Sequence, residues 1–155
     1  METKTLHINI QKGLLSELSQ EEQNLCLSAL EASKDAYTPY SSYHVGAAVL
    51  MEDGTVVMGN NQENIAYPSG LCAERTAIFY ANARHPHLSV KAIALTATHK
   101  GEQVSFISPC GSCRQALAET EKRFDKPIPI LLFGKENSIH RFASVADLLP
   151  FSFEM

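Results

Sequence analysis

Three cysteines of this chain have a spacing that allows their sulfur atoms to meet. Cys110 and Cys113 form a Cys-x-x-Cys pair, and Cys72 lies well upstream of it, followed closely by Glu74 and Arg75. A Cys-x-x-Cys pair can bind a metal ion, form a redox disulfide or pack as core thiols. A plain amphipathic helix needs no thiol, carboxylate and guanidinium side by side, so this combination favours a metal site.

The surrounding sequence predicts the elements that position these residues. Residues 72–83 and 110–124 have the apolar spacing of helices, so each would begin at a cysteine. The apolar runs 91–98 and 128–133 are typical of buried strands. Residues 45–60 predict two strands joined by an Asp-Gly hairpin turn. Helices that follow neighbouring strands would bring the three cysteines together at one edge of a sheet.

Shorter signals complete the expected architecture. Ser19 and Glu22 form a capping box for a first helix, which we expect to run until Pro39 breaks it. Residues 139–142 suggest an edge strand, and Ser144 caps a last short helix.

The order of these elements predicts the fold class. Strands that alternate with helices indicate a mostly parallel sheet, which the hairpin makes mixed. We predict an α/β fold, a three-layer α/β/α sandwich with a mixed five-stranded sheet. The whole chain, residues 1–155, would form a single domain, and residues 1–17 would be an N-terminal extension.

Three thiolates at helix starts fit Zn²⁺, which takes four tetrahedral ligands. Three protein ligands leave one position open for water, as in catalytic zinc sites. Glu74 is too close to Cys72 along the chain to be a comfortable fourth ligand, so we expect it to carry protons instead. Three thiolates also leave the site negatively charged. Helix N-termini and the guanidinium of Arg75 would offset this charge.

Two plainer interpretations remain open at this stage. The three cysteines can be buried core thiols, or they can form a closed structural zinc site with a fourth ligand. The candidates for that ligand are His44, His99 and Cys26. We expect His44 to be a surface or packing histidine, and Cys26 to lie on the apolar stripe of the first helix.

Four stretches match the motifs of one enzyme family in content and order. They are AYTPYSSYHVGAAVL, GNNQENIAYPSGLCAERTAI, SPCGSCRQ and DLLPFSF. Through them, residues 20–153 resemble the small, homotetrameric, zinc-dependent cytidine deaminases. Zinc deaminases share a ligand-x-Glu segment followed by Pro-Cys-x-x-Cys, in which the glutamate is not a ligand. The resemblance implies a cytidine deaminase-like fold.

The resemblance also implies a reaction and its central residues. Zn²⁺, one per chain, would be held by Cys72, Cys110 and Cys113. Glu74 would move protons during hydrolytic deamination of cytidine and 2′-deoxycytidine to uridine and 2′-deoxyuridine, a reaction of pyrimidine salvage. Arg75 would stabilise the thiolates.

The substrate contacts are implied in the same way. Asn61 and Glu63 would bind the ribose hydroxyls, and the backbone of Ala73 would contact the polar edge of the pyrimidine. Tyr43, where the family commonly has Phe, would line the pocket. Phe153 would reach the base bound by a neighbouring subunit, so the homotetramer would share its active sites.

Composition bounds the partners and the compartment. The chain carries 13 Lys and Arg against 17 Asp and Glu, a formal net charge of −4. We therefore expect a small-molecule pyrimidine nucleoside rather than a nucleic acid polymer. The chain has no apolar run of membrane-spanning length and no signal-peptide core, so we expect no membrane partner and a cytoplasmic location.

Three other functions compete with this prediction. The chemistry can serve a modified nucleoside or a nucleoside antibiotic such as blasticidin S. The chain can also be a non-catalytic zinc-binding or interaction module, for which Glu74 would be dispensable. A polynucleotide editor fits poorly, because the chain is acidic and lacks a basic stripe.

Overall fold

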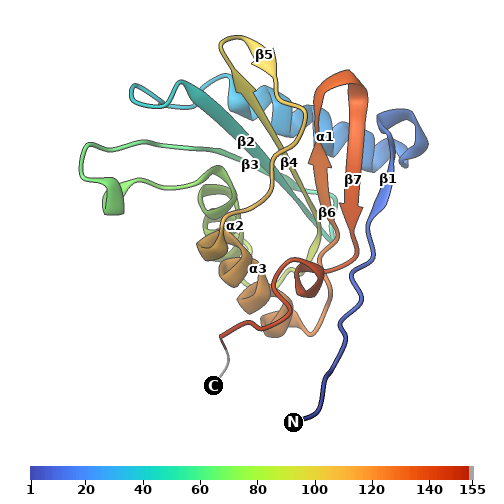
Figure 1. Cartoon of the computed structure of the whole chain (residues 1–155). Helices are drawn as coiled ribbons and strands as arrows, with labels where there is room; N and C mark the ends of the chain where they lie inside the picture. The colour runs from blue at the N-terminus through green and yellow to red at the C-terminus, as the bar shows by residue number, and fades with distance from the viewer. Residues whose placement is uncertain (154–155) are drawn as a thin grey trace.

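The computed structural model describes residues 1–153, and a β-sheet lies at its centre between two layers of helices (Figure 1). Helix α1 (Gln20–Ser33) covers one face of the sheet. Helices α2 (Ala73–Arg84) and α3 (Gly111–Phe124) cover the other. The predicted three-layer α/β/α sandwich is therefore confirmed.

The described residues form seven strands rather than the five predicted. Their order in the sheet is β1-β7-β6-β4-β2-β3, and β5 pairs with β4. The strands are β1 (Gln11–Leu14), β2 (Tyr43–Met51), β3 (Val56–Asn60), β4 (Val90–His99), β5 (Glu102–Gln103), β6 (Ile130–Phe133) and β7 (Ser138–Phe142). The two additional strands, β1 and β5, are short and polar, so they lack the apolar pattern that marks a strand in sequence.

The prediction of a mostly parallel sheet is wrong. Among the described strands, β4 and β6 form the one parallel pair, and the other pairs are antiparallel. Helix α2 does cross over the sheet from β3 to β4, but β2 lies between these strands and runs antiparallel to both. The expected edge strand, β7, is also an inner strand, because β1 pairs with its outer side.

Several local predictions are confirmed, and one boundary differs. The Ser19 hydroxyl accepts a hydrogen bond from the Glu22 amide at 3.3 Å, as the capping box requires. The Asp53-Gly54 turn joins β2 to β3, with Gly54 at φ 87°. The last short helix is a 3₁₀ turn whose Ser144 hydroxyl accepts from the Ala146 amide. Helix α1, however, ends at Ser33 instead of running to Pro39.

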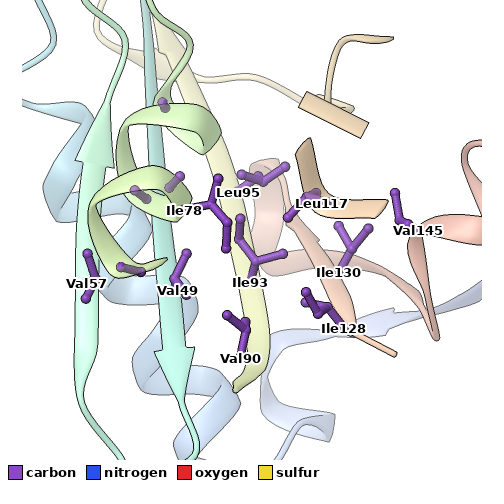
Figure 2. Close-up of a cluster of buried hydrophobic side chains, with 14 of the residues drawn as sticks. Val49, Val57, Ile78, Val90, Ile93, Leu95, Leu117, Ile128, Ile130 and Val145 are labelled. Carbon is purple, nitrogen blue, oxygen red and sulfur yellow. The ribbon is translucent and has the colours of Figure 1, made fainter. Parts of the chain in front are cut away.

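The core follows the two-residue alternation of the central strands. In β4, Ile93 and Leu95 point to the face covered by α2 and α3, whereas Ala92 and Ala94 point to α1. Figure 2 shows the hydrophobic cluster on the face covered by α2 and α3, in which side chains from the sheet meet Ile78 of α2 and Leu117 of α3. The cluster fixes both helices against the sheet, because each buried aliphatic side chain contributes about 1.5–3 kcal/mol.

Helix α2 lies close against the sheet at Gly59 in β3. A Cβ atom at this position would lie 2.6 Å from the Ala77 amide nitrogen and 2.8 Å from the Ala73 carbonyl oxygen. The missing side chain therefore lets the helix backbone rest directly on the strand. This contact sets the position of the helix that starts after Cys72.

Candidate functional site

The three cysteines meet where α2 and α3 begin. Cys72 is the N-cap residue of α2, Cys110 is the N-cap residue of α3, and Cys113 lies in the first turn of α3. The Sγ atoms of Cys72 and Cys110 are 3.8 Å apart, and those of Cys110 and Cys113 are 3.4 Å apart. All three sulfurs lie within 4.8 Å of one another. The predicted convergence of the cysteines is confirmed.

This donor set fits a tetrahedral zinc ion. Zn–S bonds of about 2.3 Å place two sulfurs of a tetrahedral site about 3.8 Å apart. All three cysteines are free thiols, and no other His, Cys, Asp or Glu of residues 1–153 joins the group. A site with three protein ligands leaves one coordination position for water or substrate, which is the arrangement of catalytic zinc.

The three candidates for a fourth ligand have other surroundings. The ring of His44 hydrogen-bonds the Thr38 hydroxyl at 3.1 Å, and the ring of His99 hydrogen-bonds the Ser42 carbonyl at 3.1 Å. Cys26 is fully buried between α1 and the opposite face of the sheet, where burial raises its pKa to about 12. The structure therefore gives no support to a closed site.

Electrostatics favour the thiolate form of Cys72. A hydrogen bond with the Cys113 thiol, together with the Arg75 guanidinium, lowers the pKa of Cys72 to about 5. Arg75 Nη2 donates to Cys72 Sγ at 3.7 Å. The Nε atom of Arg75 is buried and has no acceptor among the described residues. The thiolate is the form that binds a metal, so the structure prepares Cys72 for that role.

Glu74 is a buried carboxyl group in the first turn of α2. Glu74 is only 5% exposed to solvent. Burial raises the pKa of Glu74 to about 7, and the negative charge on Cys72 acts in the same direction. A carboxyl group with a pKa close to neutrality can both accept and release a proton at physiological pH.

A cavity of about 500 Å³ opens beside Cys72. Its walls include Cys72, Arg75 and the two residues implied in ribose binding, Asn61 and Glu63. This volume is within the range of small-molecule sites. The cavity thus joins one of the three clustered cysteines to polar groups of the loop that follows β3.

Backbone hydrogen bonds hold that loop against the start of α2. The amide of Gln62 donates to the carbonyl of Leu71 at 2.9 Å, and the reverse bond is also 2.9 Å long. On the other side, Tyr37 exchanges backbone hydrogen bonds with Asn61 and Glu63 at 3.0 and 2.9 Å. Because Leu71 precedes Cys72, these bonds fix the loop next to the first cysteine of the cluster.

The polar side chains of the loop are held in place. Asn61 Oδ1 accepts from the Val45 amide at 2.8 Å, and its Nδ2 donates to the Tyr43 carbonyl at 2.9 Å. The Glu63 carboxylate accepts from the Tyr40 amide at 2.9 Å and from the amide and hydroxyl of Ser41. These bonds, chiefly that of the Ser41 hydroxyl, lower the pKa of Glu63. Both side chains retain hydrogen-bonding capacity for a ligand.

Three other implied residues occupy different places. Ala73 is fully buried at the first position of α2, where its amide has no acceptor within the helix. Tyr43 starts β2, packs its ring 5.6 Å from that of His99, and is not part of the cavity wall. Phe153 lies on the C-terminal segment, 73% exposed and outside the cavity of its own chain.

Sequence reasoning missed the residues that support the site. Tyr40 and Ser41 orient Glu63, and Arg114 donates from Nε to the Pro109 carbonyl at 2.8 Å and from Nη2 to the Ser108 hydroxyl at 3.0 Å. Arg114 thereby fixes the loop that precedes Cys110. Its position beside the Cys-x-x-Cys pair is the one signal that the sequence offers.

Comparison with known proteins agrees with this geometry. Residues 19–125 match the family model described as the cytidine and deoxycytidylate deaminase zinc-binding region. A cytidine deaminase of Sporosarcina psychrophila is 41% identical over 131 residues, which cover 84% of this chain and 90% of that protein. A cytidine deaminase of Halalkalibacterium halodurans is 40% identical over 135 residues, or 86% and 94% of the two chains.

The fold agrees as well. The crystal structure of cytidine deaminase from Burkholderia pseudomallei superposes with a TM-score of 0.73 at 36% identity, covering 88% of this chain and all of that chain. The resemblance inferred from four short motifs is therefore confirmed across most of the sequence. With its cysteine trio at paired helix starts, the chain belongs to the cytidine and deoxycytidylate deaminase family.

Proposed function

We propose that this chain is a cytidine deaminase, which hydrolyses cytidine and 2′-deoxycytidine to uridine and 2′-deoxyuridine with release of ammonia. One observation carries the proposal. Three cysteine sulfurs cluster at two helix starts next to the buried carboxyl group of Glu74, and one of these cysteines, Cys72, lines a cavity whose wall also carries Asn61 and Glu63. The relatives that match most of the chain are cytidine deaminases, which supports the same reaction.

Cys72, Cys110 and Cys113 hold one Zn²⁺ per chain in this proposal. When bound through three protein ligands, Zn²⁺ activates a water molecule at neutral pH. Arg75 stabilises the Cys72 thiolate through its hydrogen bond, and the N-termini of α2 and α3 add partial positive charge. Together they offset the excess negative charge of three thiolates.

Glu74 transfers protons during the reaction. Its carboxylate accepts a proton from the attacking water and delivers it to N3 of the pyrimidine. It then assists protonation of the departing ammonia. One carboxyl group can do both, because its pKa lies near 7 and its burial keeps bulk water away from the transferred proton.

The nucleoside is held by the loop and by the start of α2. Asn61 and Glu63 hydrogen-bond the ribose hydroxyls, and the Ala73 backbone contacts the polar edge of the base. The bonds from Tyr40 and Ser41 keep the Glu63 carboxylate at the cavity wall. Tyr43 contributes to the pocket when the base is bound.

A neighbouring subunit completes each site in a homotetramer. Phe153 is exposed and does not line the cavity of its own chain, and its ring is suited to cover the base in another subunit. The active sites are then shared, and an isolated chain has an incomplete substrate pocket.

The reaction belongs to pyrimidine salvage and takes place in the cytoplasm. A reducing compartment keeps the three cysteines available as metal ligands. Within residues 1–153, the structure contains no helix with the length and apolarity needed to span a bilayer. Residues 1–155 form a single deaminase domain in this proposal, and the N-terminal extension, residues 1–17, adds strand β1 to its sheet.

The competing functions have less support. Blasticidin S or another modified nucleoside is not favoured, because the matched relatives are cytidine deaminases. A non-catalytic zinc module does not explain why a carboxyl group is buried beside the ligands.

The test is turnover of cytidine by the purified, zinc-loaded protein. We expect ammonia release together with the ultraviolet change that accompanies formation of uridine, and the same with 2′-deoxycytidine. Blasticidin S serves as the comparison substrate. If neither free nucleoside is turned over, the proposed function is wrong.

A further inference from the structure

The side chain of Gln115 in α3 pairs with the backbone of Phe153. Gln115 Nε2 donates to the Phe153 carbonyl at 3.0 Å, and the Phe153 amide donates to Gln115 Oε1 at 2.9 Å. The side-chain amide thus satisfies both polar backbone groups of one residue, as a neighbouring strand would. Among the described residues, Gln115 is the hydrogen-bond partner of the Phe153 backbone.

The adjacent residue holds the beginning of the same segment. Arg114 Nη1 donates to the Leu148 carbonyl at 2.7 Å, while Nε of the same guanidinium donates to the Pro109 carbonyl at 2.8 Å. The chain from Leu148 to Phe153 is therefore attached at both ends to the first turns of α3. Figure 1 shows this C-terminal segment passing alongside α3.

Burial contributes little to the position of Phe153. The residue is 73% exposed and borders a small hollow of about 190 Å³ beside α3. Ordering an exposed residue is entropically unfavourable, and the two hydrogen bonds from Gln115 favour one position of its backbone.

We propose that Gln115 is a positioning residue for Phe153, so that the ring is presented at a fixed place relative to the helix that carries Cys110 and Cys113. The inference rests on the proposed function, in which Phe153 covers the base in a neighbouring subunit. Gln115 acts through Phe153 and touches neither the substrate nor the metal.

The first test is the KM for cytidine of Gln115→Ala. Each neutral hydrogen bond changes an equilibrium by a factor of roughly 2–12, so loss of two should raise KM by a factor between about 4 and about 140. We expect kcat to change less than about twofold and zinc content to stay the same, since the contacts of Glu74 and the cysteines are untouched. Gln115→Glu keeps the acceptor but loses the donor, so its KM should lie between those of wild type and Gln115→Ala.

The control is the same substitution on the opposite face of the sheet, Gln20→Ala in α1, which should leave KM unchanged. Phe153→Ala should raise KM, and adding Gln115→Ala to it should cause no further increase. An unchanged KM in Gln115→Ala would overturn the inference, and so would a full second increase in the double variant.

Hydrogen exchange of the Phe153 amide gives a readout that needs no substrate. In the zinc-loaded protein we expect exchange to be slow in wild type and Gln20→Ala, and roughly tenfold faster in Gln115→Ala. Unchanged exchange overturns the inference whatever the activity. If wild type fails to turn over cytidine but exchange accelerates as expected, the proposed function fails, and the placement of Phe153 by Gln115 is supported.

Discussion

Replacing Gly59 with alanine tests whether the sheet positions helix α2, which begins after Cys72. Gly59 lies in β3, outside the cysteine cluster, yet its missing side chain is what allows α2 to rest on β3. An added Cβ would meet the Ala77 amide nitrogen at 2.6 Å and the Ala73 carbonyl at 2.8 Å. Both are backbone atoms of the helix, so no side-chain rotation can relieve the contact.

The displacement can be worked out from these distances. An ordinary contact begins at 3.4 Å, so the 2.6 Å separation requires α2 to move by about 0.8 Å. Overpacking of this kind costs about 2 kcal/mol, which lowers the unfolding temperature of a chain this size by about 4–8 °C. The same shift moves Cys72 and Glu74 with the helix, and a misplacement of about 1 Å can reduce turnover roughly 100-fold.

The measurement is thermal unfolding of zinc-loaded protein at one fixed concentration, together with kcat/KM for cytidine per bound zinc. Gly13→Ala is the matched control. Its Cβ would approach the Glu17 carboxylate even more closely, but that group is the flexible end of an exposed side chain and can move aside. We therefore expect Gly13→Ala to change the unfolding temperature by less than about 2 °C.

The ranking of the two variants decides the matter. If Gly13→Ala lowered the unfolding temperature more than Gly59→Ala, the loss of stability would not depend on whether the new methyl group meets backbone atoms or a flexible side chain. If Gly59→Ala lost stability but kept full turnover per zinc, the contact would support the fold without setting the position of Glu74.

Three further predictions concern the site itself. Glu74→Gln should retain zinc but lower kcat roughly 10²–10⁴-fold, because the amide cannot transfer protons; metal analysis and steady-state kinetics check both parts, and retained activity would contradict the proton-shuttle role. Arg75→Gln should slow turnover roughly 10–100-fold by removing the donor to Cys72, and a faster variant would show that our charge argument has the wrong sign. Removing zinc with a chelator should make Cys72 and Cys110 react with an alkylating agent, as measured by mass spectrometry, whereas buried Cys26 should stay unmodified. If all four thiols stayed unmodified after the chelator was added, metal binding by Cys72, Cys110 and Cys113 would be contradicted.

The metal-binding part of the site is predictable from sequence because its determinants are local. Helical spacing after Cys72 and after Cys110 places each residue at a helix start. The long strands before these helices, β3 and β4, both run antiparallel to β2 and therefore in the same direction, so both helices can start at one edge of the sheet. Burial of Glu74 follows from its place in the first turn of α2, beside Cys72.

The directions of the strands are where the prediction from sequence is wrong. The apolar runs of β2 and β4 look alike whether their neighbours are parallel or antiparallel, since both strands are buried on both faces. The insertion of β2 between β3 and β4 is decided by the hairpin and by long-range packing. A pattern of alternating helices and strands carries no information on that choice.

The nucleoside side of the cavity was accessible only through the family resemblance. The loop with Asn61 and Glu63 is held by backbone bonds from Tyr37 and Leu71, and backbone bonds leave no signature in residue types. Helical spacing even suggested that Tyr37 would continue α1, whereas the helix ends at Ser33. Local chemistry therefore identified the reaction centre, and tertiary contacts alone bring the substrate loop to it.

The charges of the cavity favour a nucleoside over a nucleotide as substrate. The family description names both kinds, cytidine and deoxycytidylate. Arg75 is the sole cation among the described residues that line it, and it is engaged with Cys72. Glu63 is kept ionised by its hydrogen bonds. A phosphate bound near that carboxylate would be repelled by it. We expect kcat/KM for cytidine to exceed that for cytidine 5′-monophosphate, and Glu63→Gln to lower the ratio of the two values. Equal use of both substrates would require a phosphate-binding cation that this cavity does not contain within the described chain.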